Sequence, residues 1–105
     1  MSNTITIKGR HKHIGQVNAG EKYTIHFKNL GFNKEIVSVR MSCNCVTAEV
    51  FGEPRNEIIT VTYKPKLPKP ENLENYYIDN LAGNILFKDG TKGKIAFGAR
   101  VFKEQ

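Results

Sequence analysis

The sequence predicts an all-β fold, an antiparallel β-sandwich of about seven to eight strands. Apolar residues recur at every second position over several short stretches, which is typical of half-buried strands. These stretches are rich in β-branched and aromatic side chains, which favour a pleated surface. Gly, Pro and Asn separate them where the chain must reverse, and no segment has a convincing helical period.

The alternating stretches follow one another along the whole chain. Their apolar positions are, in order, Ile5 and Ile7; Tyr23, Ile25 and Phe27; Val37, Val39 and Met41; Ile59, Val61 and Tyr63; Ile85 and Phe87; and Ile95, Phe97, Ala99 and Val101. Asp89-Gly90 between the last two stretches predicts a hairpin turn. We expect the core to consist of Tyr23, Ile25, Phe27, Val37, Val39, Ile59, Val61, Phe87, Ile95 and Phe97.

Two segments depart from this alternation. Residues 11–17 are predicted to cross from one sheet edge to the other. Residues 64–80 form a Pro-, Lys- and Asn-rich connection, longer than is usual in a compact domain. Tyr76 and Tyr77, near its end, either cap the core or form a contact patch. All these stretches fit one domain over residues 1–105, because a chain of this length rarely holds two.

Composition excludes several classes of protein. Hydrophobic residues make up 39% and charged residues 25%, as in ordinary globular proteins. No apolar stretch approaches the ~20 residues of a membrane span, so we expect no membrane contact. The first ten residues lack the apolar core of a secretory signal, so we expect no signal peptide.

The net charge of +6 is concentrated in the N-terminal part, because residues 1–40 carry a balance of +5. Such an excess favours acidic partners, although a solvated basic face would explain it as well. Few aromatic residues lie among these cations, so we do not expect a nucleic-acid partner. The predicted partner contacts are Lys8, Arg10, Lys12, Lys66, Lys69, Tyr76 and Tyr77.

Cys43 and Cys45 form the one constellation with chemical potential. On an extended strand, cysteines two residues apart lie ~6–7 Å apart. A disulfide needs Cβ atoms about 3.5–4.5 Å apart, so bridging them would require a bend. We favour buried structural thiols, and a strained, reducible disulfide is the second possibility. A metal site at Cys43 and Cys45 is the third, because thiolates suit monovalent copper.

Other catalytic patterns are missing from the sequence. It has no Gly-rich phosphate loop and no nucleophile elbow, and its acids are scattered rather than paired. His11 and His13 lie two residues apart, which is more typical of a solvated pair than of half a metal site. We therefore expect neither an enzyme nor a cofactor, and no small-molecule substrate.

Four motifs resemble a family of bacterial Ig-like domains of the Hydin and abnormal-spindle type. They are Gly15-Gln16-Val17 before the Gly20-Glu21 turn, Phe27-Lys28-Asn29-Leu30-Gly31, Ser42-Cys43-Asn44-Cys45, and Tyr63-Lys64-Pro65. The chain departs from the family at Ile14, where a Phe is usual, and at Asn44, where a Gly is usual. The resemblance implies an Ig-like sandwich, and it implies fold far more than activity.

From these observations we predict a non-enzymatic structural or interaction module. Ig-like sandwiches present loops and faces to partners, and such domains occur on tailed-phage particles. Ten Asn, ten Ile and twelve Lys indicate an AT-rich coding genome, as many phages have. The favoured hypothesis is a capsid-decoration or auxiliary protein of a virion, assembled in the host cytoplasm. The alternatives are a copper-binding or redox protein that uses the cysteines and, third, a basic nucleic-acid-associated protein.

Overall fold

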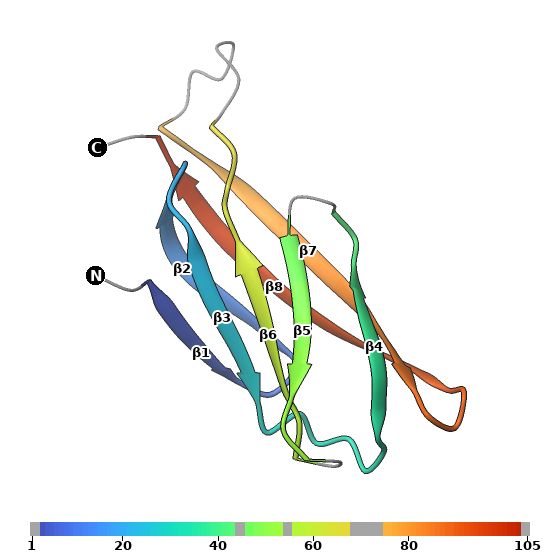
Figure 1. Ribbon diagram of the computed structural model, residues 1–105. Coiled ribbons are helices and arrows are strands. Elements are labelled where there is room, and N and C mark those ends of the chain that lie inside the picture. The colour runs from blue at the N-terminus through green and yellow to red at the C-terminus, as the bar shows by residue number, and fades with distance from the viewer. Residues whose placement is uncertain (1–2, 44–45, 54–55, 68–74, 104–105) are drawn as a thin grey trace.

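The computed structural model describes residues 3–43, 46–53, 56–67 and 75–103, and all its regular elements are β-strands (Figure 1). The strands are β1 (Thr4–Lys8), β2 (His11–Asn18), β3 (Tyr23–Lys28), β4 (Ile36–Met41), β5 (Val46–Phe51), β6 (Ile58–Tyr63), β7 (Tyr76–Phe87) and β8 (Lys92–Phe102). They form two four-stranded sheets, ordered β1-β3-β6-β5 and β2-β8-β7-β4. The predicted all-β sandwich is confirmed, and β2 and β5 add to the six stretches singled out from the sequence.

The chain changes sheets at Gly9 and Arg10, so the crossing predicted for residues 11–17 is misplaced: those residues belong to β2. β1 pairs with β3 in one sheet, and after the corner at Gly9, β2 pairs with β8 in the other. Both of these pairs are parallel, whereas every other pair is antiparallel. The prediction of a purely antiparallel sandwich is therefore wrong at this edge. β1 pairs with β3, which follows only after the chain has passed through the other sheet, and β2 pairs with β8 near the end of the chain. Neither strand pairs with the next strand in sequence through a hairpin, so antiparallel pairing is not imposed on them.

The core lies between the sheets and contains three aromatic rings in contact. The ring of Phe97 packs against Phe27 and Tyr63, with centroids 6.3 Å and 5.2 Å away. All three side chains are almost fully buried. Of the ten predicted core residues, eight are buried: Tyr23, Ile25, Phe27, Ile59, Val61, Phe87, Ile95 and Phe97.

Val37 contradicts its predicted place in the core, because its side chain is 57% exposed. In the pairing of β4 with β7, Ile36 lies opposite Phe87 and Ser38 opposite Leu86, so Val37 is an extra residue in a β-bulge. The bulge gives the inward position to Ile36, which is buried. Val39 returns to the inward phase opposite Ile85, at the open edge of the sandwich, and is only partly buried.

β7 begins earlier than predicted, so the predicted connection over 64–80 is wrong for residues 76–80. Its 12 residues alternate outward and inward along their whole length and pair with β8 from Tyr76–Phe102 to Leu86–Lys92. The Asp89-Gly90 hairpin turn is confirmed: the amide of Gly90 donates to Phe87 O at 3.0 Å, and Gly90 has a φ of 88°. Hydrogen bonds from Thr91 hold the pKa of Asp89 below its usual range.

The outer faces of the two sheets differ in chemistry. On the β1-β3-β6-β5 sheet, four threonines face one another in a row across all four strands: Thr4, Thr24, Thr62 and Thr47. The next row contains two more threonines, with His26 bonded to Thr60 at 3.0 Å. This outer face is therefore largely uncharged and hydroxylated, which suits a solvated sheet surface.

We expect Phe27→Ala to lower the free energy of unfolding by about 3–5 kcal/mol, because it empties the centre of the core. Val37→Ala should change it by less than about 0.5 kcal/mol, because the bulge holds Val37 at the surface. Urea denaturation of both variants measures the two values. A cost under about 1 kcal/mol for Phe27→Ala would mean that the inward phase of β3 is wrong.

Candidate interaction surfaces

Cys43 is not the free buried thiol that the sequence favoured, because it is disulfide-bonded. The other cysteine of the chain, Cys45, lies outside the described residues. β4 ends at Met41, and the amide of Val46 donates to Cys43 O at 3.3 Å, so the chain reverses between β4 and β5. The strand does not continue to Cys43, contrary to what was assumed from the spacing. The sulfur of Cys43 is half-buried against the core and is not a thiolate that could capture copper.

The described part of the chain holds no group of three or more His, Cys, Asp or Glu side chains placed to bind a metal ion. Nor does it hold a helix long and apolar enough to cross a membrane. The contacts predicted from the sequence can be placed on the surfaces of the sandwich.

Lys8, Arg10 and Lys12 surround the corner between β1 and β2, and we call them the basic corner. Lys8 lies opposite Lys28 in the parallel pair of β1 and β3, so two cations are neighbours on the threonine-rich side. The guanidinium of Arg10 lies 4.7 Å from the ring centroid of Phe32, a cation–π contact. All three basic side chains are exposed.

Lys66, Tyr76 and Tyr77 lie at the other end of the sandwich, and Lys69 lies outside the described residues. The hydroxyl of Tyr77 donates to Lys66 O at 2.7 Å, and burial raises its pKa, so Tyr77 ties the connection to β7. Tyr76 is 36% exposed, with the Arg100 guanidinium 5.0 Å from its ring. The amide of Ala96 donates a hydrogen bond to Arg10 O in the basic corner, and Phe102 pairs with Tyr76. Ala96 and Phe102 lie about 20 Å apart along β8. The predicted contacts are thus two separate groups rather than one site.

A larger basic surface, which the sequence analysis missed, is the outer face of the β2-β8-β7-β4 sheet. Even-numbered residues of β7 and β8 point outward and pair with one another, which forms rows of side chains across the two strands. Outward residues of β4 extend these rows by pairing with β7. Asn84 lies between Lys94 on one side and Arg40 on the other, so the Cα atoms of the two cations are about 10 Å apart. We call this surface the basic face; its cations are Arg40, Lys92, Lys94 and Arg100, and His11 and His13 lie along its β2 edge.

None of the outward residues of these four strands, all of which are described, is an acid. The one carboxylate in the strands, Asp79, is on the inward side, where the Tyr63 hydroxyl donates to it at 2.7 Å. Burial and this bond raise the pKa of Tyr63 above its ordinary value. The separation of about 10 Å between the Cα atoms of Lys94 and Arg40 is comparable to the Debye length near physiological salt. The electrostatic fields of the two cations therefore add at the surface.

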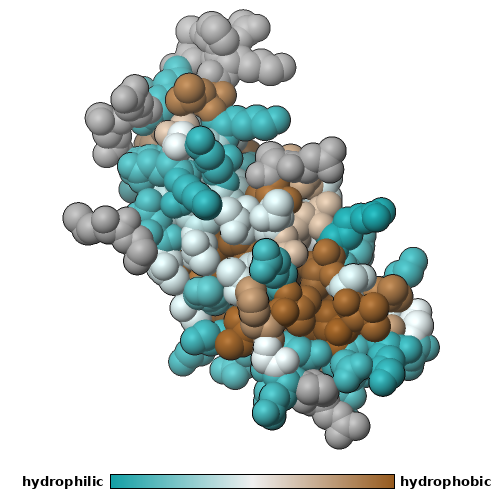
Figure 2. Space-filling view, in the orientation of Figure 1, coloured by the Kyte–Doolittle hydropathy of each residue, from teal (hydrophilic) through white to brown (hydrophobic). Residues whose placement is uncertain are grey.

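An apolar strip runs along the open side of the sandwich, where β4 and β5 contact each other from different sheets. Figure 2 shows this strip as brown surface on the right, over the region of β5 and β4 in Figure 1. Val37 and Phe51 are 57% and 51% exposed, and the others are partly buried against the core. We call it the apolar edge; it comprises Val37, Val39, Met41, Ala48, Val50 and Phe51.

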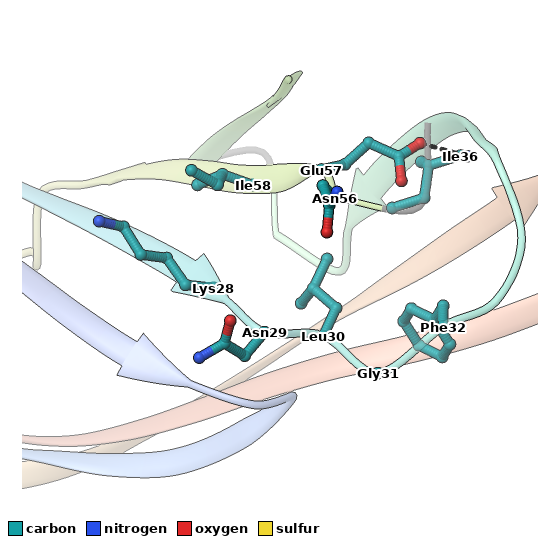
Figure 3. Close-up of a pocket in the computed structure, with 9 residues that line it drawn as sticks. All are labelled: Lys28, Asn29, Leu30, Gly31, Phe32, Ile36, Asn56, Glu57 and Ile58. Atoms are coloured by element: carbon teal, nitrogen blue, oxygen red, sulfur yellow. Dashed lines mark hydrogen bonds between the residues drawn. The ribbon is translucent and has the colours of Figure 1, made fainter. Parts of the chain in front are cut away.

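A hollow of about 400 Å³ lies between the β3–β4 and β5–β6 loops (Figure 3). Leu30 and Ile36 form its apolar wall, and Lys28, Asn29 and Asn56 lie around it. Glu57, which is 8% exposed, accepts a hydrogen bond from the Ile36 amide at 2.7 Å and so joins the two loops. Asn29 has a φ of 52°, a conformation that Asn adopts more readily than most residues. The hydrogen bond from Ile36 gives the Glu57 carboxylate a structural role, because it holds the start of β4.

Comparisons with known proteins support the fold. No protein-family model matches the sequence, and no curated protein matches it. Among solved structures, the chain is similar to the SrpA adhesin R347E mutant from Streptococcus sanguinis, with a TM-score of 0.61 and 13% sequence identity. The match covers 86% of this chain and 55% of that chain, so the protein spans about half the length of the adhesin structure. At this identity the likeness shows a shared β-sandwich fold.

We expect Tyr63→Phe to lower the free energy of unfolding at pH 8 by about 1–2 kcal/mol, because Asp79 loses its donor. The raised pKa of Tyr63 also gives a pH dependence. Its stabilisation is complete below pH 10.0, the ordinary tyrosine pKa, and is lost as the pH rises above that value, because the unfolded chain ionises first. Urea denaturation from pH 8 to pH 11 should therefore show a shallower alkaline decline in the variant.

Tyr76→Phe is the matched control, since the Tyr76 ring lies at the surface. In both variants the free energy of unfolding still declines at alkaline pH, because burial also raises the pKa of Tyr23 and of Tyr77. Equal alkaline declines in Tyr63→Phe and wild type would show that the pKa of Tyr63 is not raised in the folded protein, and so would contradict its burial beside Asp79.

Proposed function

We propose that this protein is a non-enzymatic Ig-like docking module that binds an acidic protein surface through its basic face. The observation that carries the proposal is the sheet face with Arg40, Lys92, Lys94 and Arg100 and no outward acid. Cations of one sign across a rigid sheet steer a partner of opposite charge and fix its orientation.

The surroundings of these cations also support a contact surface. Ala82 and Ala96 lie opposite each other at its centre, so small side chains separate the cations at the two ends of the face. Ile78 and Leu86, 52% and 38% exposed, point outward from β7 beside Arg100 and Lys92. Exposed apolar groups among cations are typical of interface patches. The likeness to an adhesin, by name a binding protein, agrees with such a role.

The partner assembly that we propose is a phage capsid, with the protein located in the virion. The Asn-, Ile- and Lys-rich composition supports this assignment, as does the small basic chain. Membership of the Hydin-type Ig-like family belongs to the same proposal and rests on the four motifs. We rank the copper-binding alternative lower, because the sulfur of Cys43 is bonded.

Gradient sedimentation of the source lysate, with mass spectrometry across the fractions, tests the assembly. We expect the protein to travel with large particles at low salt and to leave them as salt rises, since surface charge contacts are screened. A protein that stays at about 12 kDa at low salt would refute the virion assignment.

Charge reversal tests which surface docks. We expect Lys94→Glu to reduce binding to the purified particles by about tenfold, because it puts a like charge against an acidic partner. Lys64→Glu, an exposed change directly after β6 of the opposite sheet, is the matched control and should have little effect. Lys8→Glu reports on the basic corner: a larger loss there than at Lys94 would move the docking surface to that corner.

A duplex DNA of random sequence and poly-L-glutamate distinguish the partner classes. The proposal expects poly-L-glutamate to compete with the particles for the protein. Competition by DNA alone would instead support the nucleic-acid-associated class.

A further inference from the structure

We propose that the partner adds an extended strand to the free edge of β4, with apolar residues on one side and acidic residues on the other. This inference deepens the proposed docking function, on which its choice of an acidic partner rests. It depends on three features of the apolar edge: its free backbone, its half-covered inner side chains and the charge next to its outer side.

The backbone of β4 is suited to a further strand. β4 is the last strand of its sheet and pairs with β7 alone among the described strands. The Ser42 amide donates to Ala82 O at 2.8 Å, so Ser42 is a residue bonded to β7. Because bonded and non-bonded residues alternate in an antiparallel pair, the backbone groups of Met41 and Val39 point away from β7. Such groups at a sheet edge pair readily with an incoming chain.

The inner side of the same edge is only half covered. Val39 and Met41 point between the sheets and pack against the core, yet both remain partly exposed. Ala48 and Val50 of β5 lie on the opposite side of the gap and are also partly exposed. Apolar side chains from an added strand would enter this gap, cover those four residues and remove apolar surface from water.

The outer side of β4 sets the charge of the incoming strand. An outward residue of that strand would lie directly beside Arg40, with Lys94 two strands further on in the same row. Cross-strand neighbours of opposite charge stabilise a sheet, and like charges destabilise it. With no outward acid on the sheet to neutralise Arg40, acidic residues are the complementary choice.

Charge also argues against a second copy of this chain as the occupant. Two β4 edges paired about a two-fold axis would form one continuous sheet and bring two basic faces onto the same side. Each copy would then set Arg40 and Lys94 near those of the other, and such repulsion suppresses a wrong partner. The β5 edge differs, because its outward Glu49 favours a basic strand. The observations therefore favour an acidic strand on β4.

The test uses a soluble fluorophore-labelled peptide of about nine alternating valines and glutamates, long enough to span the six residues of β4. Binding is followed by fluorescence anisotropy and by amide hydrogen exchange of the full chain. We expect the amides of Val39 and Met41 to exchange at least about tenfold more slowly with the peptide bound. A peptide of the same composition with its valines and glutamates in separate blocks should not protect them, and neither should an alternating valine–lysine peptide.

Two variants locate the charge contact. Arg40→Glu, an exposed change on β4, should weaken binding of the alternating peptide by about tenfold. Lys28→Glu makes the same change on the other sheet and should leave it unaltered. No binding, equal binding of the block peptide, or protection on β5 in place of β4 overturns the strand addition.

The outcomes also separate this inference from the proposed function. If the peptide binds along β8 and leaves the amides of Val39 and Met41 unprotected, strand addition is wrong and docking by the basic face stands. If the β4 amides are protected while Lys94→Glu leaves particle binding unchanged, the edge takes a strand but the basic face is not the docking surface.

Discussion

The ring of Phe97 between Phe27 and Tyr63 is the contact on which the rest of the sandwich depends. It joins the central strands β3, β6 and β8 of both sheets, with each ring packed edge-on or tilted against Phe97. Tyr63 extends this contact through its hydroxyl, which reaches across to Asp79 of β7. The aromatic cluster and this bond hold the inward phase of β7 and β8. Because side chains alternate, the same constraint sends Lys92, Lys94 and Arg100 outward.

The strand alternation was predictable because the core positions differ strongly in hydropathy from their neighbours. Six strands and eight of ten core residues follow from it, and so does the Asp89-Gly90 turn. Val37 was not predictable in the same way. Ile36 and Val37 are both β-branched, and the choice between them depends on a bulge in the pairing with β7, which no local pattern shows. The start of β7 at Tyr76 was hidden because the usual alternation is reversed there: the acid Asp79 points inward and the apolar Ile78 points outward.

The basic face was missed for a related reason. Counting charge along the chain assigns the excess to residues 1–40, whereas the face collects its cations from β4 and β8, more than fifty residues apart. Only the register Arg40–Asn84–Lys94 brings two of them into one row. The predicted contacts divided for the same reason: Arg10 and Tyr76 lie at different heights along β8. Cys43 departed from expectation because β4 ends two residues before it.

The difference between the two outer faces has a consequence for how many copies can accumulate on a surface. The basic face carries four cations and no outward acid, so the rest of the protein has a net charge of about +2 out of the total of +6. A protein attached by that face therefore presents only this smaller charge to the solvent. The opposite outer face presents the hydroxylated row of Thr4, Thr24, Thr62 and Thr47, with Lys8, Lys28 and the single acid Glu49 beside it. Such a surface offers no acidic patch to the basic face of the next copy. If the protein docks as proposed, coverage would then be self-limiting, and the assembly would gain a single layer with an outer chemistry unlike that of the surface beneath it.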